Sequence, residues 1–243
     1  MRTVVIGDVH GCALELNELL CKLNVQPGTD RIIFTGDLVD RGPGSLDVVK
    51  TARALGATVV MGNHDEKHVR WLKHEAVRKV TGKKNPMRFS PDRVEIAEGL
   101  YREGLAEWIA TWPSYARIDD LMVVVHAGAL PNVSIEDQHP NDLLHVRFID
   151  NTTGKSAPLV DLKQPPDSTY WAEMWTGPES IIYGHNVDDL FRPKVHNPVP
   201  DVRCYGIDTG CVFGGSLSAM ILPDFRVVQV QARAAYSPRY MNE

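Results

Sequence analysis

The chain has 243 residues, of which 43% are hydrophobic and 23% are charged, and its formal net charge is −5. Such a chain can bury a sizeable core, and no apolar run approaches the roughly 18 residues that a membrane span needs. The mild negative charge disfavours an extended nucleic-acid groove and no signal-peptide pattern is present, so we expect a cytoplasmic protein without a membrane partner.

The first half of the chain alternates runs of strand type with runs of helical spacing. Residues 3–6 form a β-branched run, and leucines recur every three or four residues over 13–23. The same order of strand, helix and strand is predicted next. A strand covers residues 31–37, a helix ends at Gly56, and a further strand ends near Asp65. This alternation predicts parallel βαβ units, in which ligands bind beyond the carboxyl ends of the strands.

The second half contains more strands and less helix. Residues 66–112 are predicted to form a helical cap, and residues 150–169 a long polar surface loop. Further apolar runs predict a second sheet, mixed or antiparallel, stacked on the first with helices outside. These runs cover residues 121–128, 180–186, 202–210, 217–223 and 226–232. The expected fold is α/β (α+β), a two-sheet sandwich with flanking helices and a cap, in a single domain over residues 1–243.

Two polar motifs follow the first two predicted strands. In GDVHG, Asp8 and His10 are one residue apart, so both side chains can reach one point. A carboxylate and an imidazole together suit Mn, Fe or Zn, although this motif alone would be structural about half the time. In GDLVDRGP, Asp37 holds the equivalent position, and its two carboxylate oxygens are able to bridge two metal ions.

Three further candidate ligands follow strands. Asn63 in GNHD offers an amide oxygen, while His126 in HAG and His185 in GHN end apolar runs among small residues that leave room for an ion. A single histidine at such a position is more often a satisfied core or rim residue. Five such segments are improbable by accident, so together they predict a metal centre.

These motifs resemble those of the calcineurin-like metallophosphoesterases of the phosphoprotein-phosphatase type. The order GDVHG, GDLVDRG, GNHD, HAG and GH matches the family pattern over nearly the whole chain. The resemblance implies two divalent metal ions (Mn, Zn, Fe, Co or Mg) that activate a bridging hydroxide against a phosphoryl group. It assigns one ion to Asp8, His10 and Asp37, and the other to Asp37, Asn63, His126 and His185.

The same resemblance implies the catalytic residues. His64 resembles the general acid that protonates the leaving oxygen, and Asp40 resembles the carboxylate that orients it. Arg41 and Arg147 resemble the arginines whose planar fork of donors binds phosphoryl oxygens. For Arg147, the alternative is a surface salt bridge.

Three segments are closer to the ApaH-like phosphatases, which are relatives of the symmetrical diadenosine tetraphosphatase. They are GNHDEK (62–67), YWAEMWTGPESIIYGH (170–185) and GIDTGCVFGGSLSA (206–219). This likeness favours hydrolysis of polyphosphate or (di)nucleoside polyphosphates, with serine/threonine phosphoproteins as the alternative substrate. A non-catalytic phosphate-binding module and a nuclease-like phosphodiesterase fit the complete set of ligands and arginines less well.

Two features have more than one interpretation. Lys79, Lys83 and Lys84 belong to a basic run after GNHD, which is either a solvated helix face or a binding strip for a phosphate chain. Trp171 and Trp175 are either a stacking surface for a nucleobase or core residues, and burial of large aromatics favours the core.

Overall fold

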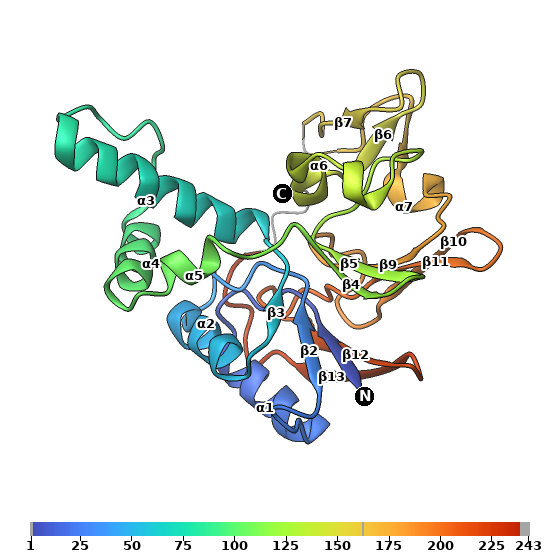
Figure 1. Cartoon of the computed structure of the whole chain (residues 1–243), viewed down its shortest axis with the longest axis horizontal. Coiled ribbons are helices and arrows are strands. Elements are labelled where there is room, and N and C mark those ends of the chain that lie inside the picture. The colour runs from blue at the N-terminus through green and yellow to red at the C-terminus, as the bar shows by residue number, and fades with distance from the viewer. Residues whose placement is uncertain (1, 162, 239–243) are drawn as a thin grey trace.

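The computed structural model of the chain describes residues 2–161 and 163–238. Two five-stranded sheets form its centre, and helices and a small third sheet surround them (Figure 1). The first sheet has the order β13-β12-β1-β2-β3, with β1, β2 and β3 parallel and β12 antiparallel to β1. Its strands are β1 (Thr3–Ile6), β2 (Arg31–Phe34), β3 (Thr58–Val59), β12 (Ser216–Leu222) and β13 (Arg226–Gln231).

The second sheet has the order β10-β11-β9-β5-β4 and is mixed, as predicted. Its strands are β4 (Tyr115–Asp119), β5 (Met122–Val125), β9 (Ser180–Tyr183), β10 (Lys194–Val199) and β11 (Val202–Gly206). The prediction that residues 217–223 and 226–232 join this sheet is wrong, because they form β12 and β13 of the first sheet. β12 is buried along its whole length, so its sequence has no polar face that could indicate which sheet it joins.

Apolar side chains fill the space between the two sheets. Val5 of the first sheet and Ile182 of the second belong to one fully buried cluster. The outer face of the first sheet packs against α1 (Ala13–Leu23) and α2 (Ser45–Ala54), whose apolar residues recur at helical spacing. Each fully buried aliphatic side chain contributes about 1.5–3 kcal/mol relative to exposure. The predicted sandwich with flanking helices is confirmed.

The outer face of the second sheet is covered by two short helices, α6 (Pro140–His145) and α7 (Trp171–Met174). Trp171 and Trp175 are 0% and 1% exposed, and the indole N–H of Trp175 donates to a backbone carbonyl at 2.7 Å. Both tryptophans are core residues, so the stacking interpretation is excluded.

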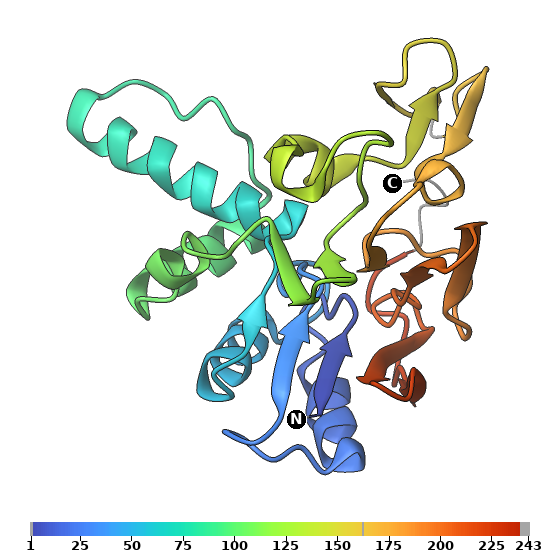
Figure 2. The ribbon, with the colours of Figure 1, turned by 45° about the vertical axis from the view of Figure 1, so that its right-hand side comes forward.

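Three helices form an arm on one side of the sandwich: α3 (Asn63–Thr81), α4 (Pro91–Arg102) and α5 (Ala106–Ile109). Figures 1 and 2 show that α3 starts at the sheets and extends away from them, with α4 alongside. The helical content predicted for residues 66–112 is confirmed, whereas the single-domain organisation stays a prediction. In the described part of the chain, no helix is both long and apolar enough to cross a membrane.

A small three-stranded sheet of order β7-β6-β8 lies on the other side. It consists of β6 (Phe148–Asp150), β7 (Ser156–Ala157) and β8 (Ser168–Tyr170). The prediction of a long surface loop over residues 150–169 is therefore wrong in part, because short strands pair at both ends of this range and at Ser156–Ala157 within it. These strands have two or three residues each, too few to show an alternating pattern in the sequence.

Candidate active site

The six predicted metal ligands come together at the carboxyl ends of the central strands. Asp8 and His10 follow β1, Asp37 follows β2, and Asn63 begins α3 just after β3, while His126 and His185 follow β5 and β9 of the second sheet. Two groups of donor atoms share Asp37, and within each group the atoms lie within 4.8 Å of one another. One group is His10, Asp37 and His64; the other is Asp37, His126 and His185.

The second group has the donor set of a cation site. Nδ1 of His126 donates to the Thr35 carbonyl at 2.9 Å, and burial lowers the pKa of His126, so the neutral ring turns a lone pair on Nε2 inward. That atom lies 3.0 Å from Oδ1 of Asn63, and Nδ1 of His185 lies 3.1 Å from the same oxygen. In this arrangement nitrogen and oxygen lone pairs converge, as metal ligands oriented by their outer partners do.

The first group contains two imidazoles and the carboxylate of Asp37, and the buried carboxylate of Asp8 lies near it. Nδ1 of His10 donates to the Val39 carbonyl at 2.9 Å, which leaves Nε2 at 3.5 Å from Oδ2 of Asp37. Burial, with help from Arg41, lowers the pKa of His10 to about 3, so the ring is neutral. Burial and the nearby carboxylates of Asp208 and Asp37 raise the pKa of Asp8 well above its ordinary value. A divalent cation would relieve this repulsion, and the residues present fit one.

Several residues of this centre have a strained backbone conformation. His10, Asp37, Asp40, Arg41 and His185 all have positive φ, between 45° and 73°, a region that costs roughly 1–2 kcal/mol for residues with a side chain. Such strain persists only where surrounding structure fixes it, and of the eleven non-glycine residues with positive φ in the described chain, these five lie at the predicted site.

Two glycines let the segments approach one another. A Cβ at Gly62 would lie 2.2 Å from the backbone nitrogen of Asp37, and a Cβ at Gly184 would lie 1.9 Å from Oδ1 of Asp8. Both distances are far below van der Waals contact, so any other residue would push the carboxylates apart.

His64 and Asp40 form the predicted dyad. Nδ1 of His64 donates to Oδ2 of Asp40 at 2.6 Å, which leaves Nε2 available for proton transfer. Asp40 also accepts from Nε2 of His68 at 2.7 Å and from Nε of Arg93 at 3.0 Å. Although burial acts to raise it, the hydrogen bonds from His64 and His68 hold the pKa of Asp40 well below its ordinary value. The carboxylate therefore stays ionised and fixes the ring of His64.

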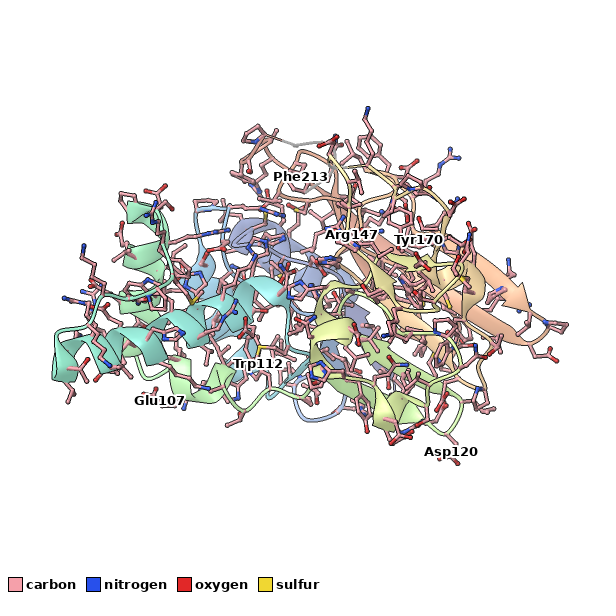
Figure 3. The ribbon with its side chains drawn as sticks, turned by 90° about the horizontal axis from the view of Figure 1, so that it is seen from above. Glu107, Trp112, Asp120, Arg147, Tyr170 and Phe213 are labelled. Carbon is pink, nitrogen blue, oxygen red and sulfur yellow. The ribbon has the colours of Figure 1, made fainter. Side chains whose placement is uncertain are left out.

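The two predicted phosphate-binding arginines differ in their surroundings. Arg41 donates to Nε2 of His10 at 3.0 Å and lies over the ring of Phe213, 5.1 Å from its centre. Arg147 lies on the side of the small sheet, near Tyr170 (Figure 3). Among residues 2–161 and 163–238, no hydrogen bond or ion pair involves its guanidinium, so the alternative of a surface salt bridge is not observed. Burial lowers the pKa of Arg147, as expected for a desolvated cation without a close anion.

The sequence did not point to several residues of this site. His68 and Arg93 support Asp40, and Thr35 donates to Oδ1 of Asp8 at 2.7 Å. Asp208 is buried beside Asp8, and its pKa is raised to about 6, chiefly by burial. His68 lies four residues after His64 and so shares its helical face, which was an available signal. Arg93 comes from α4, and only the tertiary structure brings it to Asp40.

The basic run after GNHD extends along the arm. Two of its arginines form ion pairs with glutamates of the same helix, Arg70 with Glu66 at 3.2 Å and Arg78 with Glu75. At a rise of about 1.5 Å per residue, the far end of α3 is roughly 27 Å from its start. A short phosphate chain bound at the candidate metal ligands would not reach the far end of α3. The interpretation of the basic run as a solvated helix face is therefore favoured.

The profile of the calcineurin-like phosphoesterases matches residues 1–228. The chain belongs to this family. The family uses divalent metal ions, and its members are hydrolases of phosphate bonds. Similar relatives include two asymmetrical bis(5'-nucleosyl)-tetraphosphatases PrpE. That of Oceanobacillus iheyensis is 29% identical, and the match covers 97% of this chain and 94% of the relative. That of Anoxybacillus flavithermus is 30% identical, and the match covers 96% of this chain and 95% of the relative.

Two further comparisons extend this relationship. The symmetrical bis(5'-nucleosyl)-tetraphosphatase of Yersinia pestis is 28% identical over 93% of this chain and 91% of its own. A solved structure provisionally described as a diadenosine tetraphosphatase has a TM-score of 0.75 and 26% identity, and the match covers 95% of this chain and 93% of that one. The expected likeness to the ApaH-like phosphatases is confirmed.

Proposed function

We propose that the chain hydrolyses phosphoanhydride bonds of nucleoside polyphosphates, with dinucleoside tetraphosphates as the foremost substrate class. The observation that carries the proposal is the set of converging donor atoms around Asp37, next to a guanidinium of Arg147 that has no hydrogen bond or ion pair with another residue of 2–161 and 163–238. The likeness to both symmetrical and asymmetrical tetraphosphatases over more than nine-tenths of the chain supports the substrate class. A cytoplasmic location stays a prediction.

We assign two divalent ions to this site. Asp8, His10 and Asp37 would hold one ion, and Asp37, Asn63, His126 and His185 the other, with Asp37 shared. When bound, such ions lower the pKa of water and neutralise charge on phosphoryl oxygens. The mixed nitrogen and oxygen ligands accept Mn, Zn, Fe, Co or Mg.

The side chains supply positioning and a proton. The Arg147 fork is suited to two phosphoryl oxygens at once, and Arg41 offers a second cation near His10. His64, held by Asp40, would donate a proton from Nε2 to the leaving oxygen. Nothing in this chemistry requires the oxygen to belong to a nucleotide, so phosphoproteins and inorganic polyphosphate remain alternative substrates.

A substrate panel tests the proposal. The full chain would be loaded with Mn and assayed on diadenosine tetraphosphate, inorganic tripolyphosphate and a phosphothreonine peptide, with products separated by chromatography. We expect the highest kcat/KM for the dinucleotide and a loss of at least about 10³-fold in Asp37→Asn, because one carboxylate would serve both ions. Preference for the peptide would refute the substrate class, and an undiminished Asp37→Asn would refute the metal assignment.

A further inference from the structure

A cavity of about 500 Å3 adjoins the candidate metal residues on the side of the small sheet. Asn63, His185 and Arg147 line it from the metal centre. Ala157, Pro158 and Leu159, from the end of β7 and the segment after it, also line it. Its volume lies within the range of about 300–1,000 Å3 that small-molecule sites have.

The charge of this cavity suits an anion. Among the described residues that line it, Arg147 is the one lysine or arginine, and neither aspartate nor glutamate is present. By contrast, a cavity of about 730 Å3 on the side of the arm mixes arginines 41, 93 and 102 with acidic residues that include Asp47, Asp92 and Glu95. A polyanion would thus meet carboxylates on the arm side and none in the cavity next to Arg147.

The apolar wall indicates a larger ligand than inorganic phosphate. The side chains of Ala157, Pro158 and Leu159 carry no charge and no donor, so these side chains add nothing to the binding of a bare phosphate chain. A base with apolar faces and a ribose would cover this wall and remove its area from water. Asn141, His145 and Ser156 add hydrogen-bonding groups around it.

We propose that this cavity binds the nucleoside of the substrate, with the phosphates directed to Arg147 and the base and sugar against Ala157, Pro158 and Leu159. This inference rests on the proposed function and specifies which part of the chain recognises a nucleotide. The 150–170 segment, with its small sheet, then sets specificity for nucleotides over inorganic phosphate chains.

The substitution Leu159→Asn tests whether the apolar wall contributes to nucleoside binding, and Val160→Asn is the matched control. Val160 is 51% exposed, follows Leu159 directly and does not line the cavity, so the same substitution there changes the segment but not the wall. For Leu159→Asn we expect KM for diadenosine tetraphosphate to rise about five- to tenfold, because apolar area against the base is lost. We expect a much smaller rise for tripolyphosphate, and no change in either KM for Val160→Asn.

A binding measurement separates this inference from the proposed function. Calorimetry with adenosine 5'-monophosphate and with inorganic phosphate on the Mn-loaded protein needs no turnover. Leu159→Asn should weaken nucleotide binding several-fold more than phosphate binding, even if the dinucleotide proves a poor substrate. Should Leu159→Asn not fold, Ser156→Trp fills the cavity from an exposed position and should give the same selective loss. Equal effects on both ligands, or no effect on either, would overturn the nucleoside assignment.

Discussion

The two sides of the active site use their arginines differently. On the arm side, Arg93 is paired with Asp40 and Arg41 contacts His10 and Phe213. On the side of the small sheet, Arg147 has no hydrogen bond or ion pair with any described residue. Arg147 is half-buried, and a desolvated cation without a close anion is costly to stability; substrate phosphate is the anion that this site is proposed to bind. Under the proposed function, the arm side positions the proton donor, and the side of the small sheet binds substrate phosphate.

The largest expected effect concerns His64. His64→Asn should lower kcat by about 10²–10⁴, the range in which general acids contribute. The loss should be greater for phenyl phosphate than for p-nitrophenyl phosphate, because the more basic leaving oxygen depends more on protonation. Steady-state kinetics on both esters measures this difference. His74→Asn, on the same helix but outside the site, is the control, and losses equal on both esters would contradict the role of a general acid.

The second prediction compares a fully buried tryptophan on the side of the small sheet with a partly buried tryptophan of the arm. Trp171, fully buried behind the small sheet, should cost about 3–5 kcal/mol of unfolding free energy when changed to Ala. Trp108 of the arm is only partly buried against Trp112, so Trp108→Ala should cost clearly less. Urea denaturation of both variants measures the difference. Equal costs would mean that the two sides are equally well packed.

The third prediction isolates Arg147. Arg147→Ala should lower kcat/KM for diadenosine tetraphosphate about 10- to 100-fold, because one or two charge-assisted hydrogen bonds to phosphate are lost. Arg147→Lys should recover only part of this loss, since an ammonium lacks the planar fork. Inhibition by inorganic phosphate should weaken in parallel. Arg102→Ala, exposed on the arm, should leave both kcat/KM and the inhibition by phosphate unchanged, and a similar loss there would remove the distinction between the two sides.

The two sides also differ in how far the sequence predicted them. The convergence of the six candidate ligands was predictable because each follows a strand in a short motif, and the carboxyl ends of the strands meet at one edge. The position of β12 in the first sheet was not predictable, because a strand buried on both faces fits either sheet. Arg93 and the cavity at Leu159 depend on contacts between segments far apart in the chain, for which no local pattern exists.

The smallest expected effect is that of Arg93, which contacts Asp40 at 3.0 Å and Nδ1 of His64 at 3.4 Å and so acts on the reaction through the dyad. Arg93→Ala should lower kcat about tenfold or less and leave KM nearly unchanged, because Asp40 still holds His64 and His68. Arg93→Lys should restore most of the rate. If Arg93 only positions the dyad, its removal should have little further effect in the His64→Asn background, because the two changes then act on one function. A rise in KM without a change in kcat would instead place Arg93 among the residues that bind substrate, and the division between the two sides would not hold.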